Sequence, residues 1–131
     1  MRTIRTSLSD FPIVEVTIDG RINEADFRIF ADEQRALLAR AKPYAQIADA
    51  SRAEIVDPRV RKLMSDFLSE TMAQASRLCL GTAVVVTSPL IRGGLTAVLW
   101  LVQTPYPIVA VGSRAEAVAF CQQKLGARAA S

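Results

Sequence analysis

Residues 82–113 decide the fold of this chain, and they read TAVVVTSPLIRGGLTAVLWLVQTPYPIVAVGS. The two ends of this stretch, 82–86 and 108–111, are apolar runs of the length of a buried strand. Between them, Ser88–Pro89 is a helix-starting pair, because serine caps the first turn and proline fits its first position. The prolines of residues 104–107 stop that helix. The pattern predicts a buried strand, a crossover helix and a second buried strand.

A transmembrane helix is the alternative interpretation of this stretch, because residues 93–113 contain no charge. About twelve residues precede the prolines, and a helix of that length spans about 18 Å, whereas the hydrocarbon core of a bilayer is about 30 Å thick. We therefore expect no transmembrane segment.

The residues before this stretch predict a hairpin followed by a helix. Residues 3–7 and 13–18 form two strands, and the second alternates apolar with polar side chains, as a half-buried strand does. Asn23 caps a helix that ends at Lys42–Pro43. Phenylalanine side chains on one face of this helix should pack it against the sheet.

A third strand, over residues 44–49, leads to a long helix. Asp57–Pro58 is a strong helix start, and the apolar stripe that follows predicts a helix to about Leu80, where Gly81 stops it. The run 82–86 is then expected to be the central strand of the sheet.

The C-terminal helix opens with a capping box over residues 113–116 and should close at Gly126. We predict one domain over residues 1–126 and a frayed C-terminal tail over 127–131. The element order is ββαβαβαβα. It predicts an α/β fold with a mixed, mostly parallel five-stranded sheet.

Composition agrees with a single soluble domain. The chain has 131 residues, 50% hydrophobic and 22% charged, which is enough to bury one core. Its net charge of +3 comes from basic residues interspersed with acidic ones, so nucleic acid is not expected as a partner. Residues 1–10 lack the apolar segment of a secretory signal, and we expect a cytoplasmic protein.

The residue types argue against catalysis. There is no histidine, which excludes Ser-His and Cys-His nucleophiles. Cys79 and Cys121 are far apart and outside any CxxC pair, so two buried free thiols are favoured over a disulfide or a metal site. Asp49 and Asp57 are the one plausible carboxylate pair, and helix capping explains Asp57 more simply. We predict no enzyme, no metal and no cofactor.

Short motifs in this order resemble the STAS domains of anti-sigma-factor antagonists and sulfate-transporter tails. Residues 18–22 (IDGRI) are similar to the family's exit from the second strand, and residues 47–51 (IADAS) to the Asp-Leu-Ser segment that ends the third. Ser88–Pro89–Leu90, with Trp100 and residues 105–107, resembles antagonist-like bacterial proteins of unassigned role. The resemblance covers residues 3–125 and implies a STAS-like fold.

One departure limits what the resemblance implies about function. Antagonist domains carry Asp-Ser-Ser/Thr-Gly before the helix after the third strand, and a serine there is phosphorylated to break the complex with an anti-sigma kinase. Here Asp57 matches the aspartate, whereas Pro58 and Arg59 stand in place of the serines. The resemblance therefore implies no standard phospho-switch. Ser51 is a nearby hydroxyl for which a turn role is the simpler interpretation.

The carboxyl ends of the parallel strands form the first candidate surface, since ligands of open α/β sheets bind there. Helix starts and arginines should converge at this edge and hold a phosphate or an acidic side chain. The alternative is a set of solvated arginines. The anion-binding candidates are Arg59, Ser88, Arg92, Ser113 and Arg114.

The helix within 88–104 supplies the second candidate surface. Its stripe of Ile91, Leu95, Val98, Leu99 and Val102 is expected to face the sheet. Trp100 then points outward beside small residues, which favours contact with another helix. The alternative is that Trp100 packs against residues 105–107 of its own chain.

We predict a non-enzymatic regulatory or scaffolding module of bacterial signalling that binds a protein partner or a second copy of itself as a homodimer. The alternative is a small-molecule protein that holds an anion or a lipid-like ligand between the third crossover helix and the sheet edge. The partner-binding candidates are Asp49, Ser51, Asp57, Arg59, Gly93, Ala97 and Trp100.

Overall fold

The computed structural model describes residues 2–54, 56–101, 104 and 106–130, and within these it describes the backbone alone of 95, 98–101 and 128–130. The elements are β1 (Ile4–Ser7), β2 (Ile13–Gly20), α1 (Glu24–Ala39), β3 (Tyr44–Ala53), α2 (Pro58–Leu78), β4 (Cys79–Val85), α3 (Pro89–Leu101), β5 (Ile108–Val111) and α4 (Arg114–Ala130).

The five strands form one sheet in the order β1-β2-β3-β4-β5. β1 pairs antiparallel with β2, and every other pairing is parallel. The predicted α/β class, element order and mixed, mostly parallel sheet are confirmed. The run 82–86 was expected at the centre, but β3 is the central strand and β4 lies next to the edge.

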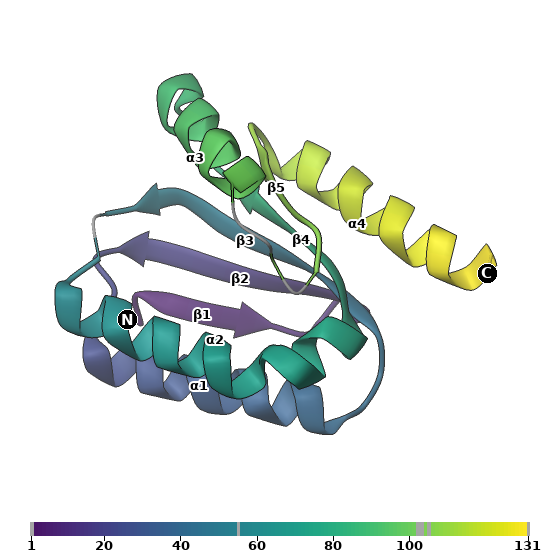
Figure 1. The fold of residues 1–131 in the computed structure, drawn as a ribbon, viewed down its shortest axis with the longest axis horizontal. Helices are drawn as coiled ribbons and strands as arrows, with labels where there is room; N and C mark the ends of the chain where they lie inside the picture. The colour runs from purple at the N-terminus through teal and green to yellow at the C-terminus, as the bar shows by residue number, and fades with distance from the viewer. Residues whose placement is uncertain (1, 55, 102–103, 105, 131) are drawn as a thin grey trace.

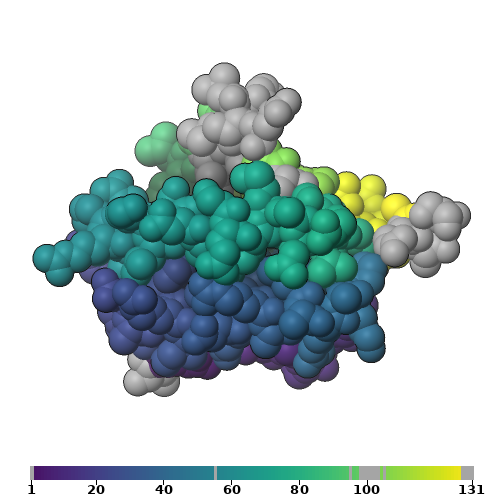
Figure 2. Space-filling model, turned by 60° about the horizontal axis from the view of Figure 1, so that its bottom comes forward, coloured from purple at the N-terminus to yellow at the C-terminus, as the bar shows by residue number. Residues whose placement is uncertain are grey.

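Helices cover both faces of the sheet (Figure 1). α1 and α2 lie side by side on one face, where Phe27 and Val60 pack onto Val16 of β2. Figure 2 shows these two helices as the outer surface of that face. α4 crosses the opposite face over β3 and β4, where Ala117 and Cys121 are fully buried against the strands.

The predicted helix starts are confirmed by their hydrogen bonds. Asp26 N donates to Asn23 Oδ1 over 2.8 Å, and Arg59 N donates to Asp57 Oδ1 over 2.8 Å. Ser88 and Ser113 accept in the same way at the starts of α3 and α4. These side chains satisfy N–H groups that have no partner inside the helix.

Two helix ends differ from the prediction because their glycines do not take the left-handed conformation that ends a helix. α2 ends at Leu78, and Gly81 lies inside β4, where Phe120 of α4 packs directly over it. α4 continues through Gly126 to Ala130, so residues 127–130 extend the helix.

α3 stands away from the sheet in Figure 1, and in the described part of the chain β5 is its main contact. Ile91 is 62% exposed, so its predicted place facing the sheet is wrong. The neighbouring residue Arg92 takes the inward position instead: its guanidinium packs over Gly112 and donates to the Val86 carbonyl over 3.2 Å. This contact ties the start of the helix to the strand ends. The other four residues of the expected stripe lie outside the described side chains.

Candidate functional site

The carboxyl ends of β2 and β3 border two hollows that contain four of the predicted partner-binding residues. The first, of about 360 Å³, lies where α1 and α2 begin. Asp57 and Arg59 line it together with Arg21 and Asn23. Asn23 and Asp57 each accept a hydrogen bond from a backbone N–H of the helix that they cap. No ion pair among the described residues involves Arg21 or Arg59.

The second hollow, of about 290 Å³, holds Asp49 and Ser51. Ser51 Oγ donates to Asp49 Oδ1 over 2.7 Å, and the Ser51 N–H donates to the same oxygen over 3.1 Å. This is the local turn-like bonding expected of the pair. Arg5 and Arg52 complete the wall, and Arg52 lies 4.0 Å from Asp19. The hollow is therefore polar and contains both signs of charge.

The three arginines named as anion-binding candidates contact three different parts of the fold. Arg59 faces the start of α1, and Arg92 is bound to the Val86 carbonyl. Arg114 donates to both carboxylate oxygens of Glu15 over 2.8 Å each. This bidentate bond lowers the pKa of Glu15 below its ordinary value of 4.5 and raises the pKa of Arg114.

The two serine candidates also form hydrogen bonds within the fold. Ser88 caps α3 and Ser113 caps α4. The structure thus engages Ser88, Arg92, Ser113 and Arg114 in bonds of the fold itself, whereas no hydrogen bond or ion pair among the described residues uses the exposed side chain of Arg59.

The residues proposed on α3 are only partly described. Gly93 and Ala97 are exposed, and a Cβ built on Gly93 meets nothing within 4 Å. The side chain of Trp100 lies outside the described residues. Leu90, at the start of the same helix, is 86% exposed. The described part of α3 therefore presents an accessible surface.

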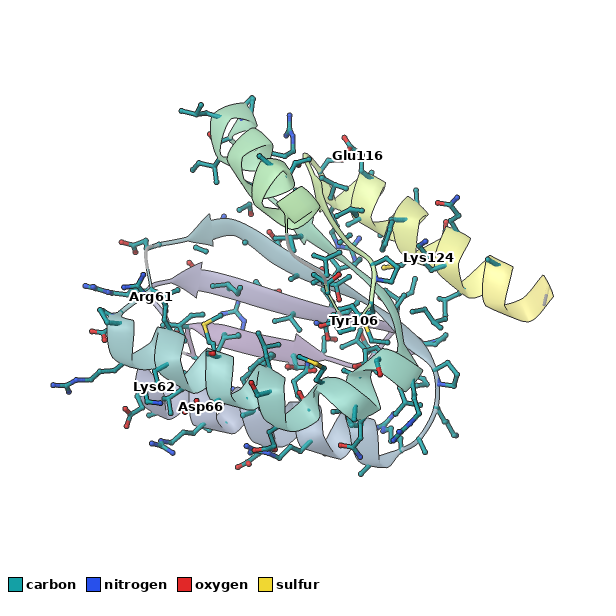
Figure 3. The ribbon with its side chains drawn as sticks, viewed as in Figure 1. Arg61, Lys62, Asp66, Tyr106, Glu116 and Lys124 are labelled. Atoms are coloured by element: carbon teal, nitrogen blue, oxygen red, sulfur yellow. The ribbon has the colours of Figure 1, made fainter. Side chains whose placement is uncertain are left out.

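A pocket that the sequence did not indicate opens between α2, β3 and β5, and its volume is about 240 Å³. Its wall and floor are mainly apolar, and Leu68 and Met72 of α2, each about half exposed, are among its residues. Tyr106 lies where the segment before β5 approaches the C-terminal half of α2 (Figure 3). The lining residues are Gln34, Leu38, Tyr44, Gln46, Phe67, Leu68, Thr71, Met72, Ala75, Thr104, Tyr106 and Ile108.

Two glutamines stand out among these residues. Gln34 is polar, yet it lies on the buried face of α1 and is only 6% exposed. Its Nε2 donates to Gln46 Oε1 over 3.2 Å. β3 presents Gln46 on the same side as Tyr44 because side chains two residues apart share a face. The signal in the sequence that could have indicated this pair is a polar glutamine at each of two positions that periodicity assigns to the core.

A buried thiol lies close to this pocket. Cys79 Sγ lies 3.6 Å from the Gly81 carbonyl oxygen and 3.6 Å from Thr82 Oγ1. Burial raises the pKa of Cys79 and of Tyr44, so both are neutral at pH 7. A neutral, buried thiol is a poor nucleophile.

Neither a cluster of metal-ligating side chains nor a membrane-spanning helix is found within the described ranges. No group of three or more His, Cys, Asp or Glu side chains there is placed to hold a metal ion. No helix in the same ranges has the length and apolar character needed to cross a bilayer.

Comparison with solved structures identifies the fold. The chain is similar to an uncharacterised protein of the DUF3478 family with a SpoIIAA-like fold from Shewanella loihica. The TM-score is 0.67 at 12% identity, over 90% of this chain and 91% of the other. It is also similar to an anti-sigma factor antagonist from Mycobacterium paratuberculosis, with a TM-score of 0.55 at 14% identity, over 92% and 93% of the two chains. The fold is therefore STAS-like, as predicted.

No protein-family model and no curated protein matches the sequence. At 12–14% identity the solved structures establish the fold and leave function to the site itself.

Proposed function

We propose that this chain is a non-enzymatic regulatory module of the cytoplasm that binds a protein partner through the carboxyl ends of β2 and β3. The observation that carries the proposal is the exposed, basic start of α2. Its first turn contains no acidic residue and presents Arg59 and Arg61, and Lys62 follows directly. Arg61 and Lys62 extend outward from the helix in Figure 3.

These cations do not stabilise the helix that carries them. A positive charge at a helix N-terminus opposes the helix dipole and costs a few tenths of a kcal/mol. Lys62 recovers part of that cost through a 3.4 Å contact with Asp66, whereas Arg59 faces the hollow beside Arg21. A partner with an acidic surface would be attracted to this end of the molecule.

The likeness to an anti-sigma factor antagonist supports a role in signalling. In this chain proline and arginine follow Asp57, so no hydroxyl stands at the start of α2 for a phosphate. We propose that partner binding here is regulated by something other than phosphorylation at that position. The outer face of α3, with Gly93, Ala97 and Trp100, is proposed as a second contact surface, for a second copy of the chain or for the partner.

A capture experiment tests the first surface. Tagged wild-type protein, Arg59→Glu and Arg77→Glu should be compared in lysate of the source organism, since Arg77 is an exposed cation in the last turn of the same helix. We expect Arg59→Glu to lose a partner that wild type and Arg77→Glu retain. The same captured proteins in all three samples would contradict the proposal.

The second surface is tested by oligomeric state. Light scattering coupled to size-exclusion chromatography should show a dimer for wild type and a folded monomer for Trp100→Glu. A wild-type monomer that also captures the same partners as Trp100→Glu would remove α3 from the interface.

The apolar pocket favours a second candidate function, the binding of a small apolar ligand between α2, β3 and β5. Ligand sites are concave and mainly apolar, with a few polar groups that fix orientation, and this pocket has that composition. None of the described residues that line it is charged, so an anion is not the ligand we propose for it. Native mass spectrometry of the purified protein tests this function, and a co-purified apolar molecule would support it.

A further inference from the structure

The Gln34–Gln46 pair is an incompletely bonded polar group inside the apolar pocket. A primary amide has two N–H donors and an oxygen with two lone pairs. Gln34 Nε2 donates to Gln46 Oε1, and among the described residues no other hydrogen bond uses either side chain. Gln34 Oε1 and Gln46 Nε2 thus have no protein partner there.

These free atoms are accessible rather than sealed in the core. Thr6 Oγ1 is the one side-chain polar atom in the described structure that is fully buried without a partner. The two glutamines both line the pocket, and neither of their free atoms is fully buried. If both amides are turned over, the bond runs in the opposite direction, and the pair still offers one donor and one acceptor.

The surroundings select the kind of group that can bond there. A buried charge without a counter-charge loses its hydration at a cost of several kcal/mol, and none of the described lining residues supplies a counter-charge. An uncharged carboxamide or hydroxyl can donate and accept hydrogen bonds, and a carbonyl can accept them. None of these groups needs a counter-ion.

We infer that the pocket binds a small amphipathic molecule whose uncharged hydrogen-bonding head group contacts Gln34 and Gln46 and whose apolar body lies against Leu38, Met72 and Ile108. This inference rests on the second candidate function above, because it names the ligand class of that same pocket. Gln34 and Gln46 are its specificity-determining residues. The exposed side chains of Leu68 and Met72 extend the apolar surface at its outer side.

Four probes with the same rigid ring system distinguish the contribution of the head group to affinity from that of the apolar body. They are naphthalene, 2-naphthol, 2-naphthamide and 2-naphthoate, measured by their fluorescence on titration with the full chain at pH 7.5. We expect 2-naphthamide and 2-naphthol to bind at least fivefold more tightly than naphthalene. We expect 2-naphthoate to bind at least tenfold more weakly than 2-naphthamide.

Matched variants test the role of the glutamines. Gln34→Met and Gln46→Met keep the length of the side chain and remove its hydrogen bonds, and Gln74→Met makes the same change on the exposed face of α2. The first two should lower 2-naphthamide affinity five- to tenfold and leave naphthalene affinity unchanged, as expected for one or two hydrogen bonds. Gln74→Met should change neither. Thermal melting of each variant verifies that it is folded.

The outcomes separate the inference from the function on which it rests. If naphthalene binds but the head group makes no difference, or if 2-naphthoate binds best, the pocket is a ligand site and the inference is wrong. If none of the four probes binds, both the ligand-binding function and the inference are wrong. Equal losses for naphthalene and 2-naphthamide in the two glutamine variants would also overturn the inference.

Discussion

Arg114, in the first turn of α4, holds Glu15 of β2 through two parallel hydrogen bonds of 2.8 Å, although the two residues are 99 positions apart in the sequence. α4 packs mainly on β3 and β4, and the bond to Glu15 also connects the helix to β2. The relationship joins the last element of the chain to one of the first.

This ion pair should make stability depend on pH. Because the pKa of Glu15 is lower in the folded protein than its ordinary value of 4.5, the pair stabilises the fold fully above about pH 5 and loses that effect as the pH falls through the lowered value. Glu15→Gln should reduce the free energy of unfolding by about 0.5–1 kcal/mol at pH 7 and by less at pH 3. Urea unfolding at the two pH values measures this.

Glu54→Gln is the matched control for that series, because Glu54 is exposed and forms no ion pair among the described residues. A loss at pH 3 as large as the loss at pH 7 for Glu15→Gln would contradict the assigned role.

Gly81 should not accept a side chain. A Cβ at this position would lie 2.8 Å from Phe120 Cζ, closer than carbon atoms approach without displacement. Gly81→Ala should therefore lower the free energy of unfolding by about 1–2 kcal/mol, and the shorter Phe120→Leu should recover part of this loss in the double variant. Gly126→Ala, where a Cβ meets nothing within 4 Å, should cause no loss.

The Asp57 carboxylate should stabilise α2 as its cap. Asp57→Ala removes the acceptor of the Arg59 N–H and should cost about 1 kcal/mol, measured by urea unfolding. Asp57→Asn keeps an acceptor oxygen and should cost much less. Equal losses for the two variants would show that charge, rather than capping, is what Asp57 contributes.

Both thiols should resist modification in the folded protein. Cys79 and Cys121 are free and buried, and burial raises the pKa of Cys121 to about 11. Fewer than one thiol per chain should react with Ellman's reagent at pH 7.5 within minutes, and two should react in 6 M guanidinium. Rapid reaction of Cys79 in the native protein would show that the region beside the pocket opens readily.

Local signals predicted the fold because they are read from neighbours in the sequence. The caps at Asn23, Asp57, Ser88 and Ser113 formed where expected, since each bonds to an N–H two or three residues away. Two helix ends differ from the prediction, because whether a glycine ends a helix depends on its backbone angles. Gly81 lies inside β4, where Phe120 of α4, a residue 39 positions later, packs against it.

The role of the candidate site residues stays a prediction. Asp49 and Ser51 of β3 line one hollow, and Asp57 and Arg59 at the start of α2 line another. Of the arginines expected to converge at this edge, Arg92 and Arg114 bond to partners on other elements, the Val86 carbonyl and Glu15. Those partners compete with any ligand, and no spacing in the sequence identifies them.

The sequence by itself therefore determined the element order, the helix caps, the mixed sheet and the lack of histidine chemistry, all of which follow from local pattern and composition. Only the tertiary structure decided that α3 stands away from the sheet, that Arg114 holds Glu15, and that Gln34 meets Gln46 inside an apolar pocket. The physical reason is that hydrogen bonds and pockets form between elements, where side chains distant in the sequence meet.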